Sequence, residues 1–167
     1  VQLVSIGMCS ALCSNQVMWC GRHFAIFTRT GHGNIGVVRP VKINESDFDD
    51  GDLDGFSPGL STFWRYLSGK QTERWGDSNV HCCFVNAEGY SSWYDWTSAK
   101  PTIRVDGVQR NAPMGLLLDL DDGTLSLYQN GRRLATLKDG LSGAYCWYAS
   151  PWINASFTIK RGLVPDE

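Results

Sequence analysis

The sequence contains no long apolar run and no strong excess of charge of either sign. Apolar runs such as MGLLL are far too short to span a bilayer. The 15 Lys and Arg residues nearly balance the 17 Asp and Glu residues, and they are scattered rather than clustered. Nucleic acids and anionic membranes attract clustered basic residues. The sequence therefore argues against both as the main partner.

The cysteines also lack the spacing of a metal site. There are six, none of them in a C-x2-C pair. A chain of 167 residues can bury a core without disulfides, so we expect buried free thiols in a reducing, cytoplasmic setting, with disulfides as the less favoured alternative. Nothing in the composition calls for a metal or another cofactor, and we expect none.

We expect the apolar first residues not to be a signal peptide, because no basic segment precedes them. The chain begins with Val, so we expect a segment cut from a longer multidomain protein. With 43% hydrophobic and 19% charged residues, and no linker or internal repeat, residues 1–167 are expected to form one globular domain that is monomeric.

Sustained helical periodicity is missing apart from one turn around Thr62–Leu67, whereas turn signals are frequent. Asp122-Gly123 and Asn130-Gly131 are pairs favoured in two-residue hairpin turns, because both positions need positive φ. Two such turns place Leu120 opposite Leu125, Leu118 opposite Leu127, and Leu127 opposite Leu134. One face of this meander then carries Leu118, Leu120, Leu125, Leu127 and Leu134, and the other carries Asp119, Asp121, Thr124, Ser126, Tyr128 and Arg133.

The same alternation recurs along the chain. Strands are expected at His23–Thr30, returning through Gly31-His32-Gly33 into Asn34–Arg39, and at Val80–Asn86, Tyr90–Trp96, Tyr145–Ser150 and Ser156–Arg161. Many short strands with glycine-rich turns indicate an all-β antiparallel sandwich or barrel. In such a sheet the adjacent Cys82 and Cys83 point to opposite faces.

Three stretches resemble a SPRY domain, the core of the B30.2 module: GRHFAIFTRTGHGNIGVVRP, GLLLDLDDGTLSLYQNGRRLATLKDGLSGAYCWYAS and FTIKRG. The hairpin run LDLDxGTLSxYxNG is that family's most recognisable signature. The resemblance covers residues from about Leu12 to Gly162, lacks a PRY segment, and looks most like SPRY domains of large multidomain protist proteins. It implies a bent antiparallel β-sandwich, a concanavalin A-like jelly roll with long edge loops, acting as a non-catalytic module that binds a protein or peptide.

Two groups of residues are candidates for partner binding. Trp152, in the loop PWINA with Asn154, matches a tryptophan that lines the peptide pocket of SPRY proteins carrying a SOCS box, and exposed aromatic rings anchor interfaces. The alternative is that it folds down as a lid over the core. The second group is Trp64, Arg65 and Tyr66, because arginine beside aromatic residues is typical of interfaces.

Other aromatic residues fit the core better. Trp75 is expected to be buried. In Trp93–Trp96, alternation sends Trp93 and Asp95 to one side of the sheet and Tyr94 and Trp96 to the other, which favours sheet packing over a binding site.

The stretch Glu45–Asp54 is the most unusual local feature. Its spacing Asp50-x-Asp52-x-Asp54-Gly55 imitates the start of an EF-hand loop, but Ser61 stands where the bidentate Glu is required. An EF-hand is therefore excluded, and we expect a solvated loop.

Two rival function classes are less consistent with the sequence. A jelly roll can also bind carbohydrate, so a lectin-like domain is the alternative; Asp119 and Asp121, however, lie on one strand beside a turn and do not form the opposed pair that glycoside hydrolysis needs. A cysteine nucleophile could be paired with His23, His32 or His81, but nothing marks one thiol as activated. We expect no catalytic residues.

Overall fold

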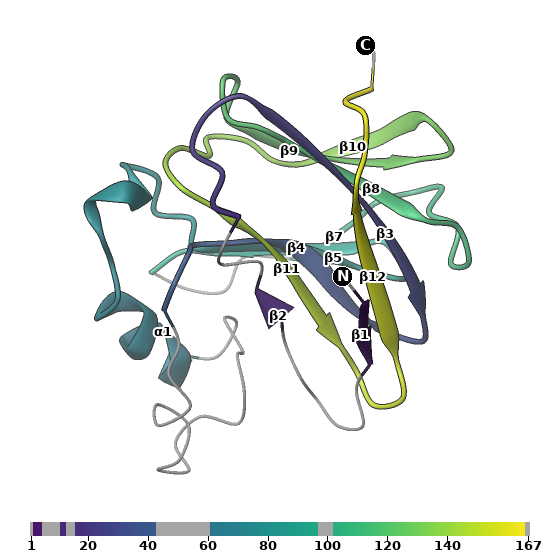
Figure 1. Cartoon of the computed structure of the whole chain (residues 1–167), viewed down its shortest axis with the longest axis horizontal. Coiled ribbons are helices and arrows are strands. Elements are labelled where there is room, and N and C mark those ends of the chain that lie inside the picture. Colours follow the sequence, from purple (N-terminus) through teal and green to yellow (C-terminus); the bar gives the residue numbers. More distant parts are fainter. Residues whose placement is uncertain (1, 5–10, 13–15, 43–60, 97–101, 166–167) are drawn as a thin grey trace.

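The chain forms two six-stranded antiparallel sheets that face each other (Figure 1). The computed structural model describes residues 2–4, 11–12, 16–42, 61–96 and 102–165. The first sheet has the strand order β1 (Gln2–Val4), β12 (Ser156–Arg161), β3 (Arg22–Thr30), β8 (Met114–Asp119), β9 (Thr124–Gln129) and β10 (Arg132–Lys138). The second has the order β2 (Ala11–Leu12), β11 (Cys146–Pro151), β4 (Gly33–Val38), β5 (Cys82–Asn86), β6 (Tyr90–Tyr94) and β7 (Ile103–Arg104).

This architecture confirms the expected antiparallel β-sandwich. The strands expected at Val80–Asn86 and Tyr90–Trp96 are found as β5 and β6, which pair with each other across Ala87-Glu88-Gly89. The expected helical turn lies in α1 (Ser61–Ser68), which is followed by a short 3-10 helix, η2 (Glu73–Trp75). No helix within these described ranges is long and apolar enough to cross a membrane. The acidic stretch Glu45–Asp54 lies outside the described residues.

Two consecutive strand pairs do not form hairpins, which corrects the expectation of a return strand after Gly31-His32-Gly33. Strand β3 belongs to the first sheet and β4 to the second, and β11 and β12 are divided in the same way. Each strand pairs instead with a strand distant in sequence: β3 with β8 and β12, and β4 with β5 and β11. Both connections therefore cross from one sheet to the other.

The meander β8–β9–β10 has its leucines on the predicted face, but its register at the first turn was predicted wrongly. Leu118 pairs with Leu125 and Asp119 with Thr124, so four residues form the turn where two were expected. The Asp119 carboxylate closes this longer turn by accepting hydrogen bonds from the backbone N–H groups of Asp121 and Asp122, both at 3.1 Å. A shift by two residues leaves every side chain on its face.

The second turn of the meander is the predicted two-residue turn. Gln129 pairs with Arg132 across Asn130-Gly131, whose φ values are 53° and 73°. A β-bulge follows, so that Ala135 rather than Leu134 lies opposite Leu127. The bulge moves Leu134 to the margin of the core, where it is only half-buried.

The main core fills the space between the two sheets. Leucines from β8 and β9 meet aromatic and β-branched side chains of the other strands, and they include Leu116, Leu118, Leu125, Leu127, Phe27, Ile35, Val37, Val85, Phe157 and Trp147. All of these except Trp147 are at most 2% exposed. Burial of this much apolar surface is the main favourable contribution to folding.

A second core covers the outer face of the second sheet. Phe63 and Leu67 of α1 pack with Trp75 on Val38, Cys82, Cys146 and Tyr148. Trp75 stacks on Trp96 with ring centroids 6.1 Å apart, which confirms its expected burial. The second sheet is thus apolar on both faces, unlike a sheet with one solvated side.

The alternation of Cys82 and Cys83 follows from these two cores. Cys83 points into the main core and Cys82 into the second core, so the opposite orientations are confirmed and both side chains are buried. Both are free thiols. Burial raises the pKa of Cys83 to about 12 and raises that of Cys82 as well. The same alternation sends Trp93 toward the main core and Tyr94 and Trp96 toward the second, as predicted.

A buried arginine directly after β4 binds backbone carbonyls of two other segments of the chain. Arg39 is 1% exposed, and its guanidinium donates hydrogen bonds to the backbone carbonyls of Ser142 (2.8 Å), Ala144 (3.0 Å) and Ser78 (2.5 Å). It lies over the ring of Tyr145, 4.1 Å from the centroid. Burial lowers the pKa of Arg39, but a guanidinium remains protonated in proteins. Carbonyl dipoles and an aromatic face therefore compensate this charge.

Replacing Arg39 by Met should lower the free energy of unfolding by about 3 kcal/mol or more, because the buried carbonyl of Ala144 and the part-buried carbonyls of Ser142 and Ser78 lose a charged donor. Urea denaturation followed by tryptophan fluorescence measures the change. The matched variant Arg132→Met alters an exposed arginine and should change stability by less than about 0.5 kcal/mol. Equal effects of the two substitutions would contradict this role of Arg39.

His81 is buried among the aromatic rings of the second core. Its ring lies 4.5 Å from that of Trp96, and neither ring nitrogen has a hydrogen-bond partner among the described residues. Burial lowers the pKa of His81 from 6.5 to about 4, and the neighbouring Asp95 opposes this only in part. The native state therefore holds His81 as the neutral imidazole.

The pKa of His81 predicts an acid-dependent loss of stability. Above pH 6.5 the imidazole is neutral in both the folded and the unfolded state, whereas between pH 6.5 and 4 only the unfolded chain binds the proton, so stability falls. In His81→Phe this fall should be smaller by up to about 3 kcal/mol. Denaturation at pH 7, 5.5 and 4 tests this, and wild-type and variant curves with the same pH slope would disprove it.

Candidate functional site

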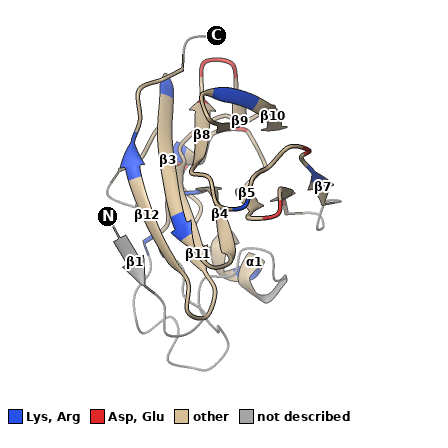
Figure 2. Ribbon diagram, turned by 90° about the vertical axis from the view of Figure 1, so that its right-hand side faces the viewer, with Lys and Arg blue, Asp and Glu red and all other residues tan. Residues whose placement is uncertain are grey.

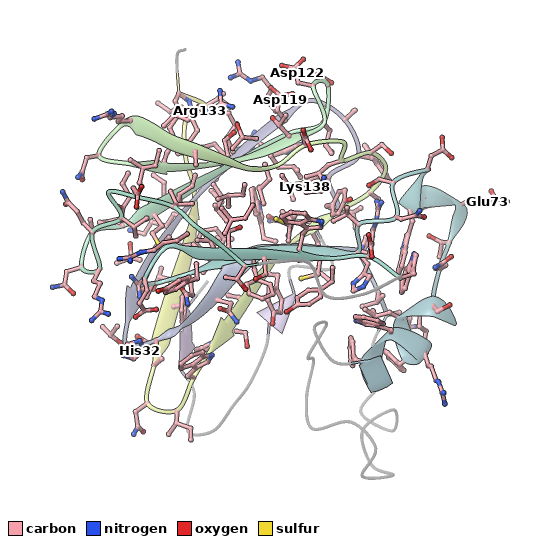
Figure 3. All side chains as sticks on the ribbon, turned by 180° about the vertical axis from the view of Figure 1, so that it is seen from behind. His32, Glu73, Asp119, Asp122, Arg133 and Lys138 are labelled. Carbon is pink, nitrogen blue, oxygen red and sulfur yellow. The ribbon has the colours of Figure 1, made fainter. Side chains whose placement is uncertain are left out.

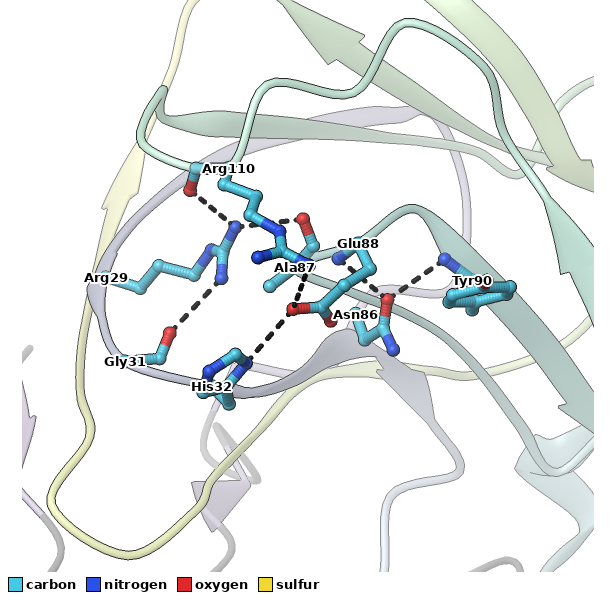
Figure 4. Close-up of polar contacts among 8 residues, drawn as sticks. All are labelled: Arg29, Gly31, His32, Asn86, Ala87, Glu88, Tyr90 and Arg110. Carbon is cyan, nitrogen blue, oxygen red and sulfur yellow. Dashed lines mark hydrogen bonds and ion pairs between the residues drawn. The ribbon is translucent and has the colours of Figure 1, made fainter.

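Four connections meet at one end of the sandwich and form a polar and aromatic surface. They are the β3–β4 connection with Gly31 and His32, the β5–β6 turn with Glu88, the β7–β8 segment with Arg110, and the β11–β12 turn with Trp152. Figure 4 shows the polar contacts among the first three of them. Loops held on a rigid sandwich are where binding residues usually lie. We call His32, Glu88, Arg110, Trp152 and Ile153 the Trp152 surface.

The crossing from β3 to β4 depends on a glycine. Gly33 has φ = 148°, and a Cβ atom built on it would lie 2.9 Å from the ring of Phe157. Only glycine fits such a backbone and such a close contact. This close passage brings His32 next to the β11–β12 turn, where the backbone N–H of Trp152 donates to the carbonyl of His32 at 3.0 Å.

Arg29, at the end of β3, holds three of the connections together. Its guanidinium donates to the carbonyls of Gly31 (3.2 Å), Ala87 (3.2 Å) and Arg110 (2.7 Å). Partial burial lowers the pKa of Arg29, while the nearby Glu88 raises it. Hydrogen bonds from a charged donor are stronger than neutral ones, so Arg29 fixes the relative positions of these loops.

The exposed side chains above this anchor interact with one another. The Nδ1 atom of His32 lies 3.0 Å from Oε1 of Glu88, and Nη2 of Arg110 lies 3.8 Å from the same oxygen. The ring of His32 stacks on that of Trp152, with centroids 5.9 Å apart and an interplanar angle of 28°. The carboxylate thus joins an imidazole and a guanidinium next to an aromatic face.

The β11–β12 turn presents its apolar side chains to solvent. Trp152 is 45% exposed and Ile153 is 63% exposed, so Trp152 does not form a lid over the core. Asn154 adopts φ = 60°, and the N–H of Ala155 donates to the carbonyl of Trp152 at 3.0 Å, which closes the turn. Asparagine tolerates the left-handed region better than most residues do. Asn154 therefore stabilises the conformation of the turn, and its role in binding stays a prediction.

The structure does not bring the second predicted group to the same place. Trp64, Arg65 and Tyr66 lie on α1, outside the second sheet and away from the β11–β12 turn (Figure 1). Because this segment is a helix, Trp64 and Tyr66 do not share a face. Trp64 is half-buried beside His81, Tyr66 is half-buried beside Phe63 and Lys70, and Arg65 is exposed. Their part in binding stays a prediction.

Sequence reasoning missed His32, Glu88 and Arg110, and it did not single out Ile153 within the loop PWINA. His32 was considered only as a partner for a thiol, and Glu88 and Arg110 were not singled out. These residues are far apart in sequence, and no spacing connects them. The one available signal was that each lies beside a turn, where side chains converge on the end of a sandwich.

The carboxylates of the LDLD run have structural roles, although only Asp119 is buried and Asp121 is exposed. Asp119 is buried, and besides closing its turn it pairs with Nε of Arg22 at 3.1 Å. Asp121 accepts a hydrogen bond from the backbone N–H of Gly21 at 2.9 Å. Figure 3 shows Asp119 and Asp122 at the opposite end of the molecule from His32. These carboxylates therefore tie the meander to the segment before β3.

The pairs of cysteine and histidine considered from the sequence do not form an activated thiol in the part of the chain that is described. His23 contacts the backbone carbonyl of Cys20 at 2.9 Å rather than its sulfur. Burial raises the pKa of the thiols of Cys82 and Cys83, which keeps them protonated, whereas a nucleophilic cysteine needs a lowered pKa.

Comparison with known proteins identifies the fold. No family model and no curated protein sequence matches the chain. Among solved structures, the SPRY domain of human HERC1 aligns with 98% of this chain and 89% of its own length, at a TM-score of 0.60 and 11% identity. The TRIM65 PSpry domain aligns with 92% of this chain and 70% of its own, at a TM-score of 0.54 and 16% identity. Stonustoxin, at a TM-score of 0.54 and 16% identity, aligns with 90% of this chain over 20% of its own length. The chain has the SPRY fold.

Replacing Arg29 by Met should loosen the connections that it holds. Loss of three hydrogen bonds from a charged donor should raise amide exchange about tenfold in residues 30–33, 86–90 and 108–111. Hydrogen exchange followed by mass spectrometry measures this, with the core strand β9 as internal reference. The control Arg132→Met should leave these segments unchanged, and unchanged exchange in Arg29→Met would refute the anchoring role.

Proposed function

We propose that this domain is a non-catalytic protein-interaction module that binds a peptide or a loop of a partner protein on the Trp152 surface. It would act without a cofactor, as a monomeric domain inside a longer intracellular protein. The SPRY fold supports the general role, since SPRY domains characteristically serve as interaction modules. The position of the binding surface is argued from this chain's own residues.

The observation that carries the proposal is the stacked pair of His32 and Trp152. When a partner covers a large ring that is 45% exposed, apolar surface is removed from water, which favours binding. Because the ring already stacks on His32, less side-chain entropy is lost when the partner binds. Trp is among the residues that contribute most at interfaces. Arg29 holds the loops beneath it in fixed positions, which favours a surface formed before the partner arrives.

The chemistry around Trp152 indicates what a partner segment should contain. Trp152 and Ile153 offer apolar area, whereas Glu88 and Arg110 offer one acceptor and one donor beside it. A segment with an apolar side chain flanked by polar groups would match both. Such a combination of an apolar centre with a polar rim is typical of protein interfaces.

Replacing Trp152 by Ala should weaken peptide binding by at least about 2 kcal/mol, equivalent to about thirtyfold in Kd. Peptides would first be selected on the wild-type domain from a random displayed library. Their affinities for each variant would then be measured by fluorescence anisotropy. The matched control is Trp19→Ala, because Trp19 is 58% exposed but lies before β3, remote in the fold from the β11–β12 turn.

The outcomes separate the proposal from its alternatives. Equal affinity of wild type and Trp152→Ala, with the variant folded, would contradict binding on the Trp152 surface. A loss in Tyr66→Ala but not in Trp152→Ala would place binding on α1 instead. Binding to a glycan array, abolished by neither substitution, would favour the lectin-like alternative.

A further inference from the structure

A groove runs along the side of the sandwich where both sheets end. Strand β10 is the last strand of the first sheet and β7 is the last strand of the second. A cavity of about 250 Å³ lies between β7 with the residues after it and the middle of β10. We call this cavity the β7–β10 groove. It is separate from the Trp152 surface, since none of the residues of that surface lines it.

The floor of the groove is apolar. Val105 and Leu137 are buried at its base, Leu134 is half-buried, and Ile103 is 47% exposed at its rim. Its volume is below the 300–1,000 Å³ of typical cofactor and drug sites. The groove is therefore suited to one apolar side chain of a larger ligand and is too small for a whole organic cofactor.

The backbone along both sides of the groove favours an extended ligand. A terminal strand has N–H and C=O groups on its outer edge that no neighbouring strand of its sheet uses. Strand β7 is two residues long and pairs only with β6, and the pairing of β10 with β9 is interrupted by two register shifts. An extended peptide can use such edges, whereas a helix has no free backbone groups to offer.

The charges beside the groove are mainly positive. Arg104 belongs to β7 and is exposed, and its guanidinium lies over the ring of Tyr90, 5.7 Å from the centroid. Strand β10 begins with the exposed Arg132 and Arg133, and the guanidinium of Arg133 donates to Thr136, which lines the groove. Figure 2 shows basic residues on both strands. Among the described residues that line the groove, Asp106 is the one acidic residue, so an acidic segment complements the groove better than a basic one.

We propose that the β7–β10 groove is a second binding site, which takes an extended acidic peptide segment. An apolar side chain of that segment enters the floor between Val105, Leu134 and Leu137, and carboxylates on either side of it pair with Arg104 and Arg133. The site does not depend on the Trp152 surface. A partner that reached both would gain affinity by linking two weak contacts.

The test uses a blocked synthetic pentapeptide with a central Leu between two Glu residues on each side. It is titrated to millimolar concentration into the ¹⁵N-labelled domain, and amide chemical shifts are recorded. Shifts should concentrate in residues 103–106 and 134–137. A matched peptide with Gln in place of every Glu should bind about tenfold more weakly, because the ion pairs with the arginines are lost.

Charge-reversal variants test which arginine interacts with the acidic peptide. Arg104→Glu should weaken binding of the acidic peptide about tenfold, whereas Arg110→Glu makes the same charge change at the Trp152 surface and should leave it unchanged. Trp152→Ala should also leave it unchanged, which keeps this proposal distinct from the previous one. The spectrum of each variant reports whether it is folded.

Several results would overturn the proposal. They are the absence of shifts in residues 103–106 and 134–137 at millimolar peptide, shifts confined to residues 31–32 and 152–154, and equal weakening by Arg104→Glu and Arg110→Glu. Broadening of the groove amides with protein concentration alone would show that a second copy of the chain occupies the groove, and would overturn it as well.

Discussion

Burial of the second sheet on both of its faces is the constraint on which the rest of the structure depends. Its inner face packs on the leucines of the meander, and its outer face packs under α1 and Trp75. Polar groups trapped between these layers must find partners within the protein. The Arg39 guanidinium does so through three backbone carbonyls, and His81 remains neutral instead. The same burial keeps the Cys82 and Cys83 thiols protonated.

The Trp152 surface follows from how the chain changes sheets. Strands β3 and β4, and likewise β11 and β12, are adjacent in sequence but lie in different sheets. Their connections therefore pass one another at the same end of the sandwich, where Trp152 bonds to the backbone of His32. Arg29 then links these connections to the β5–β6 turn and the β7–β8 segment. On the side where both sheets end, the last strands β7 and β10 leave a groove between them. The two proposed sites therefore arise from different features of one architecture.

Much of the fold could be predicted because it depends on local alternation. The leucine face of the meander, the opposite orientations of Cys82 and Cys83, and the burial of Trp75 all agree with the structure. The errors have local causes as well. The Asp119 side chain closes a four-residue turn, and a bulge displaces Leu134 from Leu127. Both alter the pairing without exchanging the two faces, since side chains repeat every two residues along a strand.

The sequence by itself determined which residues alternate, where the chain turns, and that a tryptophan occupies the last inter-strand turn. Period-two alternation and turn chemistry are properties of neighbouring residues, so they can be read without knowing what packs on what. Only the tertiary structure decided that consecutive strands enter different sheets, that α1 covers the outer face of the second sheet, and that Arg29, His32, Glu88 and Arg110 meet at one end. Contacts between residues distant in sequence depend on how the sheets pack, and no local pattern specifies them.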